Sequence, residues 1–104
     1  MNATLAAQAA ALDAAAQLAR VHGQLPGARI EVSYVHPGRI FVSLHNDLGE
    51  FEAWREALGI LAADVRREDH TPGRMSLTAT CTFAGVEIEL TGYAPAITPD
   101  RVSH

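Results

Sequence analysis

The stretch from residue 75 to residue 90 constrains the fold more than any other part of the chain, because apolar and polar residues alternate along it. Side chains of a β-strand point to opposite faces with a period of two, so this alternation predicts strands with one buried and one solvated face. Ala84 and Gly85 separate two halves, which predicts a hairpin. The apolar positions are Met75, Leu77, Ala79, Cys81 and Phe83 in the first half and Val86, Ile88 and Leu90 in the second.

Upstream of this hairpin the sequence predicts two helices with a second pair of strands between them. Residues 3–22 are rich in alanine, which has the highest helix propensity, and their polar side chains form one stripe. Residues 29–45 alternate on both sides of Pro37 and Gly38 and predict a hairpin. In residues 47–58 large apolar side chains recur at helical spacing and predict the second helix.

These elements predict a two-layer α+β domain in the order α-β-β-α-(β)-β-β, with one antiparallel sheet and both helices packed on its apolar face. The bracketed strand falls in residues 63–69, where the sequence is compatible with a charged edge strand and with a plain loop. We expect a single domain over residues 1–93. After Gly92 we expect an extended tail over residues 94–104, which contain two prolines.

Composition excludes several classes of partner and compartment. The chain has 104 residues and a formal net charge of −4, and it contains no lysine, so a broad basic surface for nucleic acid is not expected. No apolar run approaches the roughly 20 residues that a membrane span requires. One cysteine allows no internal disulfide, which favours a cytoplasmic protein. Abundant Ala, Arg, Gly and Pro with no Lys indicate a high-GC bacterium or its phage.

Four residues are candidates for a ligand pocket between the helices and the sheet. Gln8 and His22 are polar residues on the apolar arc of the first predicted helix, and ligand pockets place a few polar groups inside apolar walls. Tyr34 comes from the first hairpin, and Trp54 lies on the apolar face of the second helix. If these four side chains converge, they predict a small-molecule site.

A second candidate site lies at the start of the second helix. His45, Asp47 and Glu50 are close in sequence there, and a helix N-terminus offers free N–H groups and a positive dipole end. The spacing of Asp47 and Glu50 is that of a capping box, which explains both acids without a catalytic role. Pairs of His or Cys at metal-binding spacing are missing from the sequence, so we predict neither a metal nor a cofactor.

Functionally, the sequence favours a small non-enzymatic protein-interaction or adaptor domain. The alanine-rich first helix offers more apolar surface than one sheet contact needs, so we expect a protein partner or a homodimer, formed through that helix or a strand edge. One alternative is a small-molecule-binding domain or small enzyme with a pocket between helices and sheet. Another is a phage or mobile-element regulator that binds a host protein.

Overall fold

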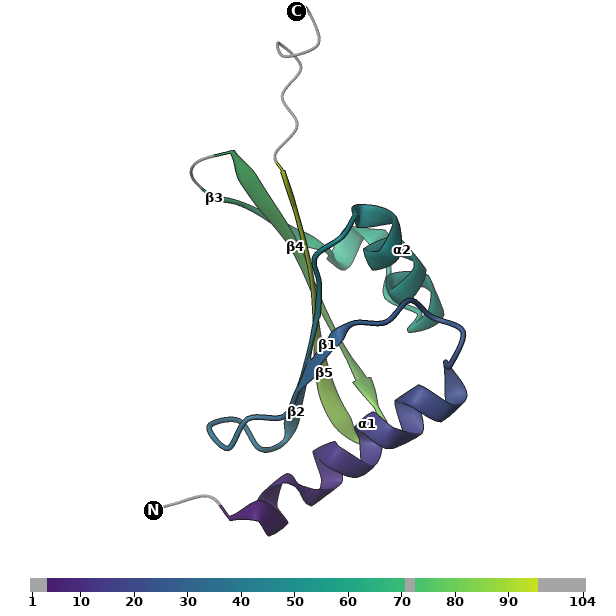
Figure 1. Cartoon of the computed structure of the whole chain (residues 1–104), viewed down its shortest axis with the longest axis vertical. Coiled ribbons are helices and arrows are strands. Elements are labelled where there is room, and N and C mark those ends of the chain that lie inside the picture. Colours follow the sequence, from purple (N-terminus) through teal and green to yellow (C-terminus); the bar gives the residue numbers. More distant parts are fainter. Residues whose placement is uncertain (1–3, 71–72, 96–104) are drawn as a thin grey trace, which may run out of the picture.

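The computed structural model describes residues 4–70 and 73–95 and consists of a five-stranded mixed sheet with two α-helices on one of its faces (Figure 1). The α+β class is therefore confirmed. Along the chain the elements are η1 (Leu5–Gln8), α1 (Ala9–Val21), β1 (Arg29–Glu31), β2 (Arg39–Leu44), α2 (Leu48–Ala57), η2 (Ala62–Asp64), β3 (Arg66–His70), β4 (Arg74–Phe83) and β5 (Val86–Pro95).

The prediction of a purely antiparallel sheet is wrong, because β2 pairs with β5 in parallel. The strand order is β1-β2-β5-β4-β3, and the other three pairings are antiparallel. After β2 the chain crosses over through α2 to the far edge, so β3 runs in the same direction as β2. The meander of β3, β4 and β5 then has an odd number of strands, and its last strand must run parallel to β2.

The hairpin of β4 and β5 is confirmed, with Cys81 facing Ile88 and Ala79 facing Leu90. Its turn contains Ala84 with φ of 52° and Gly85 with φ of 78°. β5 is longer than predicted and ends at Pro95, so residues 94 and 95 belong to the sheet and not to the expected tail. The remainder of that tail, residues 96–104, lies outside the described residues.

The two edge strands differ from each other and from the predictions. β1 has three residues, and Ile30 faces Val42 in β2, so the expected strand does not continue through Val32 to Tyr34. At the opposite edge, β3 settles the two interpretations of residues 63–69 in favour of a strand that begins at Arg66. All five residues of β3 are exposed. Charged side chains on an edge strand oppose pairing with other chains.

The short helix η1, which leads into α1, and helix α2 each begin at a side chain that accepts a backbone hydrogen bond. The Thr4 hydroxyl accepts from the Ala7 N–H over 3.3 Å, and Asp47 Oδ1 accepts from the Glu50 N–H over 3.0 Å. The second contact confirms the predicted cap of α2. α2 ends before Gly59, whose φ of 73° lies in the left-handed region that favours glycine. Neither helix in the described part of the chain is long and apolar enough to cross a membrane.

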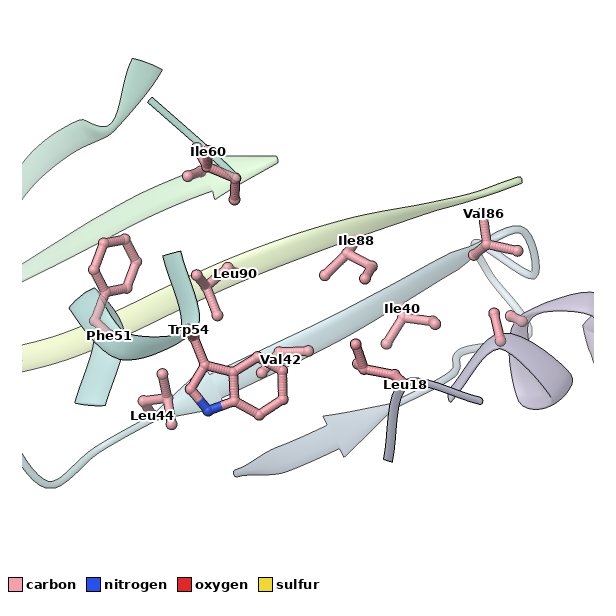
Figure 2. Packing of buried hydrophobic residues seen from close by; sticks show 13 residues of the cluster. Leu18, Ile40, Val42, Leu44, Phe51, Trp54, Ile60, Val86, Ile88 and Leu90 are labelled. Atoms are coloured by element: carbon pink, nitrogen blue, oxygen red, sulfur yellow. The ribbon is translucent and has the colours of Figure 1, made fainter. Parts of the chain in front are cut away.

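One hydrophobic core lies between the helices and the sheet. Leu18 from α1 and Phe51 and Trp54 from α2 belong to the same buried cluster as the sheet residues. Figure 2 shows these three side chains with the sheet residues Ile40, Val42, Leu44, Val86, Ile88 and Leu90. The opposite face of the sheet is not covered by the described residues (Figure 1).

Gly92 is a point of close approach between α2 and the sheet. It is buried in β5, between Leu44 of β2 and Leu77 of β4. A Cβ atom at this position would lie 2.9 Å from Cβ and Cδ1 of Phe51, closer than real Cβ atoms come to other carbons. The absent side chain at Gly92 therefore lets the Phe51 ring rest directly on the strand.

We predict that Gly92→Ala lowers the free energy of unfolding by about 1–3 kcal/mol, because the added methyl group overpacks the contact with Phe51. Chemical denaturation measures the loss. Gly38→Ala is the matched control, because a Cβ at Gly38 has no neighbour within 4 Å. Equal stability of the two variants would contradict the close approach of Phe51 to β5.

Candidate functional site

Two of the four predicted pocket residues line one small cavity. His22 at the end of α1 and Trp54 of α2 bound a space of about 230 Å³, together with the segment that leads into β1. The indole N–H of Trp54 donates a 2.9 Å hydrogen bond to the Pro26 carbonyl and holds this segment against α2. The other lining residues are Leu18, Ala19, Gly23, Leu25, Pro26, Gly27, Ala28 and Ile30.

Gln8 and Tyr34 do not line this cavity. The Gln8 side-chain amide donates a 3.1 Å hydrogen bond to the Val32 carbonyl, which ties the start of α1 to the end of β1. Tyr34 lies in the loop between β1 and β2 and is 70% exposed. The structure therefore brings His22 and Trp54 together and leaves Gln8 and Tyr34 with other surroundings.

The candidate constellation at the start of α2 has the geometry of a helix cap. Asp47 accepts the Glu50 N–H, and Asn46 Nδ2 donates to both oxygens of the Glu50 carboxylate over 3.4 Å. The His45 ring lies parallel to the Tyr93 ring, with centroids 4.9 Å apart and an interplanar angle of 8°. The two acids thus make their contacts within the first turn of α2 and the residue before it, while His45 packs on the uncovered face of the sheet.

The uncovered face carries an ion-pair cluster that links the two parallel strands. Arg39 Nη2 of β2 lies 2.7 Å from Glu87 Oε1, and its Nη1 lies 3.3 Å from Glu89 Oε1. The guanidinium carbon also lies 5.8 Å from the centroid of the Phe41 ring. The alternation of apolar and polar residues predicts that both glutamates face water. It does not predict that they share Arg39, because this contact depends on the pairing of β2 with β5.

α1 and the helical turn η1 that leads into it carry a second apolar surface, which faces solvent; Leu5 belongs to η1 and the other residues of this surface belong to α1. The polar residues Asp13, Gln17 and Arg20 form the predicted stripe on another side of the helix. Leu5 is 74% exposed and Leu12 is 46% exposed. With the exposed alanines between and beyond them they form a series at spacings of four, three and four residues, which we call the α1 seam: Leu5, Ala9, Leu12 and Ala16.

This spacing is the one found at the contact line of paired helices. Apolar residues that alternate between separations of three and four recur every 3.5 residues on average and face a partner helix along a narrow strip. The surplus apolar surface of the first helix could be inferred from the sequence. Which part of this surface remains exposed could not be inferred, because it depends on which side of α1 packs on the sheet. That side carries the buried residues Ala11, Ala14 and Leu18.

The described residues are poorly suited to bind a metal ion or to supply a nucleophile. Over residues 4–70 and 73–95, no group of three or more His, Cys, Asp or Glu side chains is placed to hold a metal ion. Cys81 is half-buried, and desolvation raises the pKa of its thiol, which keeps it protonated and poorly nucleophilic near neutral pH.

Comparisons with known proteins found no match to this chain, whether among family models, curated proteins or solved structures.

We predict that Trp54→Phe lowers the free energy of unfolding by about 1–2 kcal/mol, because it removes the hydrogen bond to the half-buried Pro26 carbonyl. Thermal or chemical denaturation measures the change. Tyr93→Phe serves as the control, since it also removes one polar group from an aromatic ring but leaves the stacking with His45 in place. If both variants were equally stable, the indole would not anchor the segment before β1.

Proposed function

We propose that this protein is a small non-enzymatic interaction domain that acts as a homodimer through the α1 seam, in the cytoplasm of a bacterium. The observation that carries the proposal is the exposure of Leu5 and Leu12 at the spacing of a helix contact line. An exposed apolar strip of this kind favours association because contact with a second chain removes it from water.

The pattern of side-chain sizes favours a second copy as the occupant. When two α1 helices pack antiparallel about a two-fold axis between Ala10 and Ala11, Leu5 lies opposite Ala16 of the second copy. In the same arrangement Leu12 lies opposite Ala9 of the second copy. Each layer then joins one large and one small side chain, so the two helices keep an even separation, near the lower end of the usual 8–10 Å.

The charged residues of α1 are compatible with this pairing. Asp13 and Arg20 belong to the polar stripe, outside the seam. In the antiparallel arrangement Asp13 lies opposite Gln8 of the second copy and not opposite another acid. An isologous contact of this type closes after two subunits, which suits a soluble dimer.

A small-molecule-binding function is the second candidate, and the cavity beside His22 and Trp54 favours it. Its support is weaker than that for docking, because the polar groups expected to hold a ligand are engaged elsewhere. Gln8 donates to the Val32 carbonyl, and the Trp54 indole donates to the Pro26 carbonyl.

Sedimentation equilibrium or light scattering tests the proposed dimer. We predict a mass twice that of the 11.1 kDa chain. The protein concentration extends to about 1 mM, because a dimer with a binding free energy of only about 4 kcal/mol has a dissociation constant near that value. Leu12→Glu places two charges in the seam of each dimer and is expected to weaken association at least about 10-fold, or about 1.4 kcal/mol.

Gln17→Glu is the matched control, because it adds the same charge to the polar stripe of the same helix and should leave the dimer intact. A monomeric wild-type protein over the whole concentration range would overturn the proposal. A dimer that is unaffected by Leu12→Glu would move the contact to another surface.

A further inference from the structure

β1 is an edge strand that differs from the other edge of the sheet in its chemistry. Within the described residues it pairs with β2 on one side, and strand order places it at the end of the sheet. An edge strand presents backbone N–H and C=O groups to which an extended chain can add as a further strand. β3 carries a charge or a histidine at every position, whereas β1 carries the apolar Ile30 between Arg29 and Glu31.

The cavity described above opens beside this edge. Ile30 forms part of its wall and is 41% exposed, so the wall can be reached from outside at β1. The remaining lining is mainly apolar and includes Leu25 and Trp54. A pocket between an edge strand and a helix is the arrangement in which an added strand gains affinity from its backbone and specificity from one side chain.

We propose that the edge of β1 and the adjoining cavity bind an extended segment of a partner protein, which pairs antiparallel with β1 and places a large apolar side chain in the cavity. Residues that face each other across paired strands share one face of the sheet. The partner residue opposite Ile30 therefore lies on the helix side, at the cavity. This site does not include the α1 seam, and its existence does not depend on the homodimer.

The charges of β1 specify the neighbours of that apolar residue. Arg29 and Glu31 project from the uncovered face, where their side chains are 68% and 59% exposed and pair with each other, with Arg29 Nη2 3.4 Å from Glu31 Oε2. An exposed pair of this kind contributes little to stability, so an added strand can exchange it for cross-strand pairs. In antiparallel pairing, the partner residue opposite Glu31 precedes the apolar residue, and the one opposite Arg29 follows it. The preferred segment thus has the order basic, apolar, acidic.

β1 of a second copy has this order as well, since it contains Arg29, Ile30 and Glu31 in sequence. However, Ile30 is already part of the wall of its own cavity. Pairing of two β1 strands would leave both cavities without an added side chain. A separate segment supplies that side chain, and for this reason we favour a partner protein over self-pairing at this edge.

Titration with short synthetic peptides tests the proposal. The probe has Arg-Leu-Glu at its centre and threonine elsewhere. Trp54 is the sole tryptophan and lines the cavity, so its fluorescence reports occupancy, and NMR shifts of the β1 amides report strand addition. We expect saturable changes in both signals. A peptide with Glu-Leu-Arg should bind about 3- to 10-fold more weakly, and one with Arg-Gly-Glu should lose the fluorescence change.

Exchange of the two charges in the protein provides the decisive control. The double variant Arg29→Glu/Glu31→Arg should prefer the Glu-Leu-Arg peptide, whereas Glu68→Arg on β3 should leave the order of affinities unchanged. Saturation without any dependence on charge order, or no response of Trp54 and the β1 amides, would overturn the proposal. So would β1 shifts that depend on protein concentration alone, because these would indicate self-pairing. Sedimentation of the same variants reports separately on the dimer.

Discussion

The contact between Phe51 and Gly92 places α2 directly on the central strand of the sheet. α2 contacts β5 more extensively than it contacts any other strand, and β5 is the central strand of the sheet. The Phe51 ring rests on the one position of β5 that has no side chain. This contact sets how closely α2 lies over β5, and α2 is part of the connection from β2 to β3. The parallel pairing of β2 and β5 follows from that connection together with the three antiparallel strands β3, β4 and β5.

The same packing determines which surfaces remain for other molecules. α2 supplies the bulky aromatic part of the core, so α1 needs to contribute only Ala11, Ala14 and Leu18. An alanine-rich helix with leucines on a second side therefore retains apolar residues in solvent. The uncovered face of the sheet has a different character, because Arg39 joins Glu87 and Glu89 there and His45 covers Tyr93. The exposed leucines of η1 and α1 and the ion-paired face of the sheet thus lie on different parts of the molecule.

Local features of the fold could be predicted from the sequence, and long-range ones could not. Alternation identified β4 and most of β5, and the spacing of Asp47 and Glu50 identified the cap of α2. The alternation of apolar and polar residues does not indicate whether β5 runs parallel or antiparallel to β2, since a strand buries the same side chains in either direction. Gly92 was interpreted as the end of the strand, because glycine often marks a boundary and its packing role requires knowledge of Phe51.

Contacts between residues close in sequence could be predicted, whereas contacts between distant residues could not. The cap at Asp47 is local, and the structure contains it. The predicted place of Tyr34 in the pocket required the strand to continue past β1, which it does not. Gln8 is absent from the cavity because its side chain donates to the Val32 carbonyl. The cavity wall from Leu25 to Ile30 was not identified, because it forms where the loop before β1 is held by the indole of Trp54.

The helices close one face of the sheet, and we propose that the α1 seam binds a second copy. Isotope-filtered NMR on a mixture of labelled and unlabelled chains detects such a contact between copies. We expect intermolecular contacts between the methyl groups of Leu12 and the methyl group of Ala9 in the other copy. Contacts confined to the uncovered face, around Phe41 and Tyr93, would contradict this proposal.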